Sequence, residues 1–171
     1  LETDCPVCTS TLLSAQTGGD RYHYGCPRCG FFSLTRTARA ILPDLLFQRA
    51  QGQAALSHAL RKMDRSGRKE CLGSDVLREL VQNSRIPSVQ EQLNNFIAWL
   101  GTSQKDPGTP AELNDETAGA TGVASPSGMS FICMHAIKSG LVHEDGVVQL
   151  FEGVVGSAML SFSGWSYFEE L

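Results

Sequence analysis

Two cysteine pairs near the start of the chain, Cys5-Pro6-Val7-Cys8 and Cys26-Pro27-Arg28-Cys29, decide how its first part folds. Two cysteines three positions apart direct both sulfurs into one tight turn. When a hairpin brings two such turns together, four thiolates lie at the corners of a tetrahedron, the geometry that Zn²⁺ prefers. Gly30 follows the second pair, where a residue with positive φ is useful after the turn. The spacing predicts a zinc ribbon that holds one Zn²⁺ ion through Cys5, Cys8, Cys26 and Cys29.

The expected role of this metal is structural. Four protein ligands fill a tetrahedron and leave no position for water or substrate. A piece of roughly 40 residues is too small to fold well on an apolar core alone, so the ion replaces part of that core. Iron in a rubredoxin-like centre is the alternative metal, because four thiolates suit it too. Two disulfides are the other alternative, which the intracellular character of the rest of the chain disfavours.

Composition places the chain among ordinary globular proteins. Its 171 residues are 42% hydrophobic and 19% charged. No apolar stretch reaches the roughly 18 residues that a membrane helix needs, so no membrane partner is expected. Cys71 and Cys133 lie in unrelated contexts and are expected to be small buried residues. This cysteine usage predicts a cytoplasmic protein. The chain begins with Leu1, without a secretion signal, and we expect it to be part of a longer protein.

Charge is distributed unevenly along the chain. Residues 21–69 carry ten Lys or Arg against two acidic residues, whereas residues 70–171 carry four basic and thirteen acidic residues. The net charge of the whole chain is −4, which by itself discourages nucleic-acid binding. The asymmetry predicts an electrostatically polarised molecule, in which the two halves are either solvated faces or attract each other.

Periodicity predicts an α+β chain that is mainly α. The expected parts are a zinc ribbon at 1–34, a helical segment at 35–100, a loop-rich connector at 101–127 and a winged-helix-like domain at 128–171 that may extend back to 74. Within the ribbon, short strands flank the turn at 17–20. In the connector, residues 111–113 suit a strand and residues 117–120 a short helix.

The helices have recognisable limits. We expect one from Thr35 to about residue 42 that Pro43 interrupts, a second at 44–64 and a third at 74–83. Ser88 and Glu91 form a capping box for a fourth, which Gly101 ends. Helix 128–139, strands at 147–151 and 158–162 and a final helix at 164–171 follow in the order of a winged helix.

Several phrases resemble one bacterial N-terminal module. They are residues 87–93 (PSVQEQL), 99–101 (WLG), 140–142 (GLV) and 160–165 (LSFSGW). That module pairs a zinc ribbon with a winged-helix-like domain and precedes effector domains that resemble TIR or nucleoside deoxyribosyltransferase enzymes in anti-phage defence proteins. The resemblance implies a regulatory domain in a defence protein, with the effector beyond Leu171. It supplies no catalytic residue.

The sequence contains no catalytic constellation. Its four histidines are scattered, and it has no nucleophile elbow, zincin motif or phosphate-binding loop. We therefore expect a non-enzymatic recognition or regulatory module that senses a partner or ligand and positions an effector domain through protein–protein interaction.

Two further functions remain open at this stage. Nucleic-acid binding would use the basic segment at 21–69, because its cations can neutralise phosphates. The candidate residues are Arg36, Arg39, Arg61, Lys62, Arg65, Arg68 and Lys69. A homo-oligomeric or interdomain interface would use Phe131 and Trp165 as apolar anchors, although both aromatic residues also suit ordinary core packing. The helix at 128–139 lacks the Arg, Asn or Gln that usually read base edges, so it is not expected to read a major groove.

Overall fold

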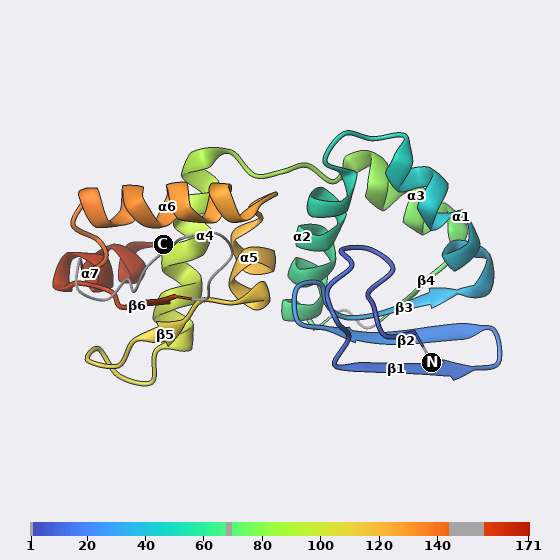
Figure 1. Cartoon of the computed structure of the whole chain (residues 1–171), viewed down its shortest axis with the longest axis horizontal. Helices are drawn as coiled ribbons and strands as arrows, with labels where there is room; N and C mark the ends of the chain where they lie inside the picture. The colour runs from blue at the N-terminus through green and yellow to red at the C-terminus, as the bar shows by residue number, and fades with distance from the viewer. Residues whose placement is uncertain (1, 68–69, 144–155) are drawn as a thin grey trace. The chain divides into compact units, whose positions relative to one another are not determined.

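The computed structural model describes residues 2–67, 70–143 and 156–171, which form a mixed α+β protein of six short strands and seven helices (Figure 1). The expected fold class is confirmed at this level. The chain divides after Ile86 into two compact units, and each has its own apolar core. Among the described residues, no helix has both the length and the apolar character that crossing a membrane requires.

The first unit is built on a four-stranded sheet in the order β1-β2-β3-β4. Strands β1 (Ser14–Gly18), β2 (Arg21–Cys26) and β3 (Gly30–Thr35) are antiparallel, and the short β4 (Cys71–Leu72) pairs parallel to β3. Alternation along the strands sends one set of side chains, including Tyr24 and Leu34, into the core. The side chains on the opposite face of these strands remain mostly at the surface.

Three helices complete this unit: α1 (Arg36–Phe47), α2 (Gly52–Arg65) and α3 (Ser74–Asn83). The expected third helix is confirmed to the residue. The expected break at Pro43 is wrong, because α1 continues through Pro43 and ends at Phe47. The buried residues Leu42 and Leu46 lie on one face of the helix, and their burial outweighs the lost backbone hydrogen bond. The break comes instead before α2, where Gln51 has a φ of 60°.

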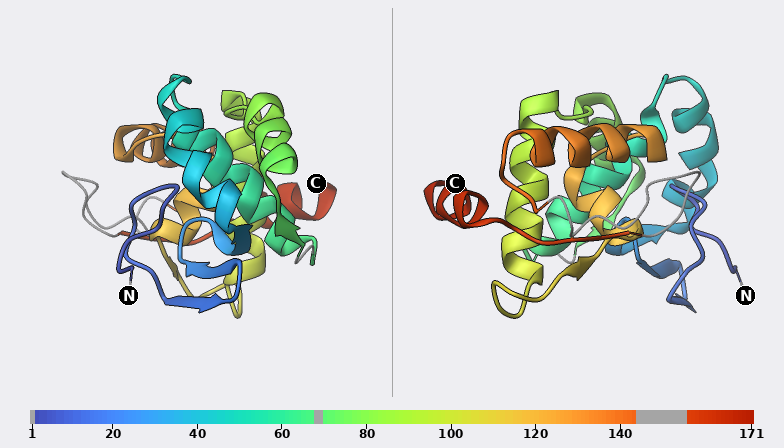
Figure 2. Two further views of the ribbon diagram at one scale, coloured as in Figure 1. Left: turned by 90° about the vertical axis from the view of Figure 1, so that its right-hand side faces the viewer. Right: turned by 60° about the vertical axis from the view of Figure 1, so that its left-hand side comes forward.

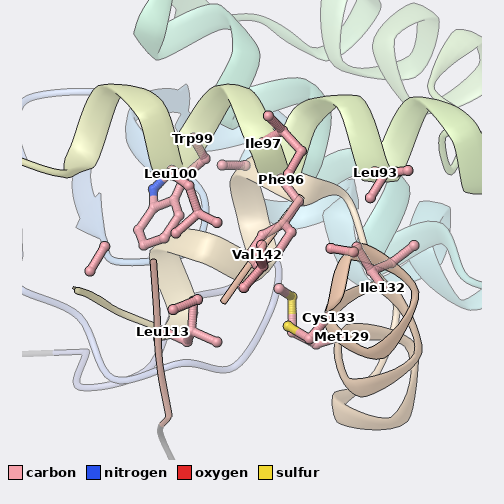
Figure 3. Packing of buried hydrophobic residues seen from close by; sticks show 14 of the residues in the cluster. Leu93, Phe96, Ile97, Trp99, Leu100, Leu113, Met129, Ile132, Cys133 and Val142 are labelled. Carbon is pink, nitrogen blue, oxygen red and sulfur yellow. The ribbon is translucent and has the colours of Figure 1, made fainter. Parts of the chain in front are cut away.

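The second unit is organised around α4 (Val89–Ser103), whose capping box is confirmed. The amide of Ser88 donates to the Glu91 carboxylate at 2.7 Å, and the amide of Glu91 donates to the Ser88 hydroxyl at 3.3 Å. Figure 3 shows how the helix buries its apolar side chains against the rest of the unit. They are Leu93, Phe96, Ile97, Trp99 and Leu100. Trp99 is therefore part of the core, whereas Val89 at the start of the helix is exposed.

The remaining elements of the second unit are two strands and three helices. They are β5 (Ala111–Glu112), α5 (Asp115–Thr121), α6 (Pro126–Lys138), β6 (Ser157–Ala158) and α7 (Phe162–Glu170) (Figure 2). β6 pairs antiparallel with β5, and an isolated bridge joins Val142 to Leu160.

Two expectations about this unit change. The strand expected at 158–162 is shorter and pairs with β5, because Ser161 caps α7 and Phe162 is already helical. The strand expected at 147–151 lies outside the described residues. Residues 101–127 do not form a loop-rich connector, since they contribute Leu113 and Val123 to the same core as α4. The division into two units at residue 86 therefore differs from the four parts outlined above.

Gly101 has a packing role that its sequence context does not reveal. It lies inside α4, which continues to Ser103, so the expectation that Gly101 ends the helix is wrong. A Cβ at Gly101 would lie 2.5 to 2.6 Å from ring atoms of Phe168 in α7. The glycine lets the aromatic ring approach the helix backbone, and Phe168 in turn packs edge-on against Trp165 with ring centroids 5.8 Å apart.

This contact predicts opposite effects for two Gly→Ala substitutions in helices. Gly101→Ala should lower the unfolding temperature, because displacing a packed ring costs about 1–3 kcal/mol and exceeds the gain of about 1 kcal/mol in helix propensity. Gly128→Ala in α6 should leave the unfolding temperature unchanged or raise it, since its added Cβ would have no neighbour closer than 3.6 Å. Thermal denaturation of both variants checks this, and equal or reversed shifts would contradict the packing argument.

Candidate metal centre

Two tight turns position the four cysteines. In the first, the amide of Thr9 donates to the Cys5 carbonyl at 3.0 Å, and the amide of Cys5 donates to the Ser10 carbonyl at 2.9 Å. In the second, Cys26 ends β2 and Cys29 immediately precedes β3, and the amide of Cys29 donates to the Cys26 sulfur at 3.3 Å. The antiparallel β2–β3 pair thus closes the second turn from both sides.

The four sulfurs form a compact cluster. All four Sγ atoms lie within 4.8 Å of one another. Sγ of Cys5 is 3.8 Å from Sγ of Cys29, and Sγ of Cys8 is 3.4 Å from Sγ of Cys26. Zn–S bonds of about 2.3 Å in a tetrahedron place neighbouring sulfurs about 3.8 Å apart. The spacing of the cluster therefore fits a metal ion with four thiolate ligands. Disulfide bonds of about 2.05 Å do not match these separations, and all six cysteines are free thiols.

Burial and proton sharing make this cluster a candidate cation site. Cys5, Cys26 and Cys29 are buried, and Cys8 is half-buried. Hydrogen bonding with Cys26 raises the pKa of the Cys29 thiol, and hydrogen bonding with Cys26 lowers the pKa of Cys8. The thiols therefore share protons instead of ionising independently. Removal of all four protons would concentrate negative charge in a low-dielectric environment, which a bound divalent cation offsets.

Ser57 on α2 supports the cluster, and the sequence analysis missed it. Its side chain is completely buried, and its Oγ lies 3.2 Å from Sγ of Cys29. When Cys29 is a metal-bound thiolate, the Ser57 hydroxyl is the group that donates, and such outer contacts orient the ligand. A signal was available in the sequence, because Ser57 is a polar residue between the apolar residues Leu56 and Leu60 of the predicted helix.

A second contact between the cluster and α2 involves Gly30. This residue has a φ of +80°, as the sequence analysis expected after the second cysteine pair. A Cβ at Gly30 would lie 2.5 Å from Oδ2 of Asp64, so the glycine also makes room for that carboxylate. The end of α2 therefore lies against the second cysteine turn.

The described residues among those proposed for nucleic-acid binding have different environments. Arg36 is exposed and pairs with Asp20 at 3.2 Å. Arg39 is partly buried, and Arg61 is only 8% exposed, so neither presents an open guanidinium to solvent. Lys62 and Arg65 are exposed near the end of α2. Arg68 and Lys69 lie outside the described residues.

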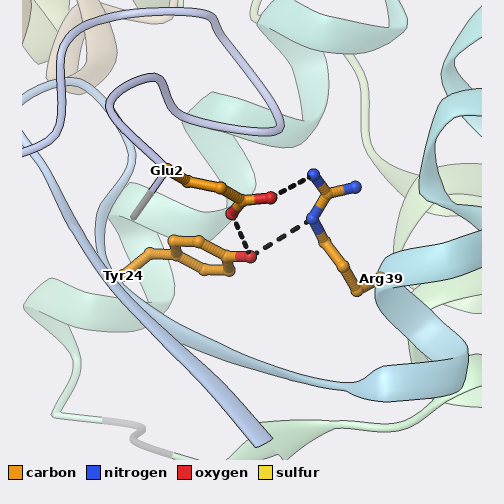
Figure 4. Close-up of polar contacts among 3 residues, drawn as sticks. All are labelled: Glu2, Tyr24 and Arg39. Carbon is orange, nitrogen blue, oxygen red and sulfur yellow. Dashed lines mark hydrogen bonds and ion pairs between the residues drawn. The ribbon is translucent and has the colours of Figure 1, made fainter. Parts of the chain in front are cut away.

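Arg39 belongs to an internal network that Figure 4 shows. Its guanidinium lies 2.6 Å from the Glu2 carboxylate and donates to the Tyr24 hydroxyl at 3.2 Å, and that hydroxyl donates to Glu2 at 2.8 Å. Burial disfavours the charged phenolate, and the hydrogen bond to Glu2 adds to this effect. Together they raise the pKa of Tyr24 to about 12. The network ties the N-terminal segment to β2 and α1.

The two apolar interface candidates have different environments. Phe131 on α6 is 58% exposed, and its ring stacks on that of His135. Trp165 on α7 is partly buried and packs against the second core. Of the two remaining cysteines, Cys133 is buried, which raises its pKa to about 12, and Cys71 is half-buried.

Comparison of the chain with protein-family models, with curated proteins and with solved structures found no match. The function therefore has to be argued from the two units themselves.

The contact between Ser57 and Cys29 predicts a change in metal affinity. Ser57→Ala should weaken zinc binding about 10- to 100-fold, because the bound thiolate loses a hydrogen-bond donor. Competition with a chromophoric chelator measures this. Ser66→Ala is the matched control, since Ser66 caps the same helix and its hydroxyl donates to the Met63 carbonyl, away from the cluster. Equal affinities for the two variants would exclude the supporting role of Ser57.

The Tyr24 network predicts a pH dependence on the alkaline side. Because the folded-state pKa of about 12 lies above the ordinary value of 10, the neutral phenol stabilises the fold fully below pH 10. This contribution is lost as the pH rises through 12. The difference in phenolate absorbance between the wild type and Tyr24→Phe should show a transition near pH 12. A transition near pH 10 in that difference would show that the network does not hold the proton.

Proposed function

We propose that this protein is a non-catalytic recognition module whose first unit is a zinc ribbon held together by one structural Zn²⁺ ion. The observation that carries the proposal is the convergence of four sulfurs, three of them buried, at tetrahedral spacing. Bound zinc would cross-link two turns that are far apart in the sequence and would supply folding free energy to a small unit.

The chemistry of the site supports a structural role over a catalytic one. Four thiolates complete the coordination of the ion, and an ion without an open position cannot activate water. Among the described residues, the four cysteines are the one group of His, Cys, Asp and Glu side chains with a geometry suited to a metal ion. Four thiolates must stay reduced to bind zinc, which supports a location in the cytoplasm.

For the second unit we propose a winged-helix-like fold. The order α4, β5, α5, α6, β6 supports this assignment, as does the pairing of β5 with β6. In such a fold α6 occupies the recognition position. Beyond its first turn, the exposed side chains are Phe131, Met134, His135 and Lys138, a set that favours a protein partner over base edges.

The same proposal extends to the role of the module in a larger protein. The resemblance noted in the sequence supports a regulatory domain that positions an effector domain in a bacterial defence protein. Phe131 is the apolar anchor that we assign to such an interface, or to a contact between copies of the chain. Trp165 has a smaller role in this proposal, because it packs on the core.

Chelation should unfold the first unit selectively. Both tryptophans, Trp99 and Trp165, lie in the second unit, so their fluorescence reports on that unit alone. A strong chelator should lower the melting temperature seen by far-ultraviolet circular dichroism for the first unit and leave the tryptophan transition in place. If chelation changes neither signal, the structural role of the metal is wrong.

Single cysteine substitutions provide the matching test. Cys5→Ser should reduce bound zinc from one ion per chain to a small fraction, because three thiolates and a poorly ionised hydroxyl bind the ion weakly. Cys71→Ser should keep one ion per chain, since Cys71 is a half-buried cysteine outside the cluster. Elemental analysis of both purified variants measures this, and loss of zinc from Cys71→Ser alone would contradict the assignment.

A further inference from the structure

The outer face of the first sheet is the surface of this unit that its helices leave uncovered. On strands β1–β3, the side chains that alternate away from the core are surface-exposed, with the exception of Gly25 and the partly buried Ser33 and Thr35. The exposed members are Ser14, Gln16, Arg21, His23 and Phe31. Strand pairing sets Gly25 opposite Phe31 and His23 opposite Ser33, so these residues form one continuous surface.

Phe31 is the most unusual residue on this face. The residue is 59% exposed although it lies in a paired strand. A Cβ at Gly25 would lie 2.8 Å from Cε1 of Phe31, so the ring lies across the glycine with its other side open. Next to it, His23 is held in place by a hydrogen bond of 2.7 Å between Nδ1 and Oγ of Ser33. The face therefore presents an aromatic ring beside a fixed imidazole.

The charge of this face selects a class of ligand. Strands β1, β2 and β3 contain no Asp or Glu, although the whole chain has 18 acidic and 14 basic residues. Arg21 is exposed at the start of β2. Residues 1–86 carry twelve Lys or Arg and eight Asp or Glu, a net charge of +4. A polyanion is therefore attracted to this unit and meets no carboxylate on the strands of the open face.

We propose that the open face of β1–β3 binds single-stranded nucleic acid, with a base stacked on Phe31 and a phosphate next to Arg21. An unpaired base offers the π-face that an exposed ring accepts, and Gln16, His23 and Ser33 can hydrogen-bond to it. A duplex hides its bases, and this flat face has no helix that enters a groove. The inference rests on the proposed function in one respect, since a folded ribbon must present the face.

Fluorescence anisotropy with labelled oligonucleotides of about a dozen nucleotides tests the proposal. The probes are one mixed sequence as single-stranded RNA, as single-stranded DNA and as duplex DNA, each measured over a range of salt concentrations. At low salt, a single strand should bind more tightly than the duplex, and comparison of the two single strands identifies the preferred sugar. No binding at low salt, or a preference for the duplex, would overturn the proposal.

Substitutions locate the site. Phe31→Ala should weaken single-strand binding about 5- to 150-fold, the effect of losing about 1–3 kcal/mol of stacking, and Phe31→Tyr should restore most of it. Phe47→Ala is the matched control, because Phe47 is 93% exposed at the end of α1. If Phe31→Ala lowers the melting temperature and leaves binding unchanged, the ring only covers Gly25 and the proposal fails.

Charge contributes separately. Arg21→Gln should weaken binding and reduce the slope of log affinity against log salt by about 0.7, whereas Arg78→Gln on α3 should change neither. Polyglutamate is the control polyanion. If it displaces the oligonucleotide at equal charge concentration, the face attracts acidic chains in general and the proposal is wrong.

Zinc content measured on each sample separates this proposal from the previous one. Full zinc occupancy without single-strand binding overturns the assignment of the open face and leaves the structural metal intact. Absence of zinc from the folded wild type overturns the structural metal instead.

Discussion

The first unit depends on the contact among four cysteine sulfurs. This contact joins the N-terminal turn to the β2–β3 hairpin, and Cys5, Cys26 and Cys29 belong to the same core as the apolar side chains of the unit. Two contacts hold α2 against this cluster. The hydroxyl of Ser57 lies next to the Cys29 sulfur, and Gly30 leaves space for the Asp64 carboxylate. Because neutral thiols at this spacing attract each other only weakly, a bound cation is the interaction with enough free energy to hold these elements together.

The second unit is organised by apolar packing. Here α4 supplies a row of large apolar side chains, and the surrounding elements bury it. One close contact of this core is the ring of Phe168 over Gly101. We therefore expect the stability of the two units to respond to different changes. The first should be sensitive to loss of the charged cysteine thiolates, and the second to changes in side-chain volume. This difference follows from composition, since the cysteines of the cluster lie in the first unit and both tryptophans lie in the second.

Features set by neighbouring residues were predictable from the sequence. The cysteine spacing predicted the cluster, the capping box at Ser88 predicted the start of α4, and the apolar face of residues 74–83 predicted α3. The failures share a cause, which is contact with distant residues. Pro43 and Gly101 interrupt isolated helices, but burial keeps α1 and α4 continuous. The pairing of β5 with β6 joins segments more than 40 residues apart, which no local pattern reveals.

The basic segment at 21–69 shows that a cluster of charged residues in the sequence need not form a binding surface in the fold. Arg39 and Arg61 turn into the first unit, where Arg39 fixes the N-terminal segment to Tyr24. The surface that we propose for recognition is instead a sheet face whose strands carry no carboxylates. Phe31 lies on this face, two residues after Cys29 in the sequence. The cysteine turn sets the start of β3 and thereby the position of that ring. In the two proposals, metal binding and recognition depend on the same turn, because an ion that orders the second turn would also hold the aromatic ring over Gly25.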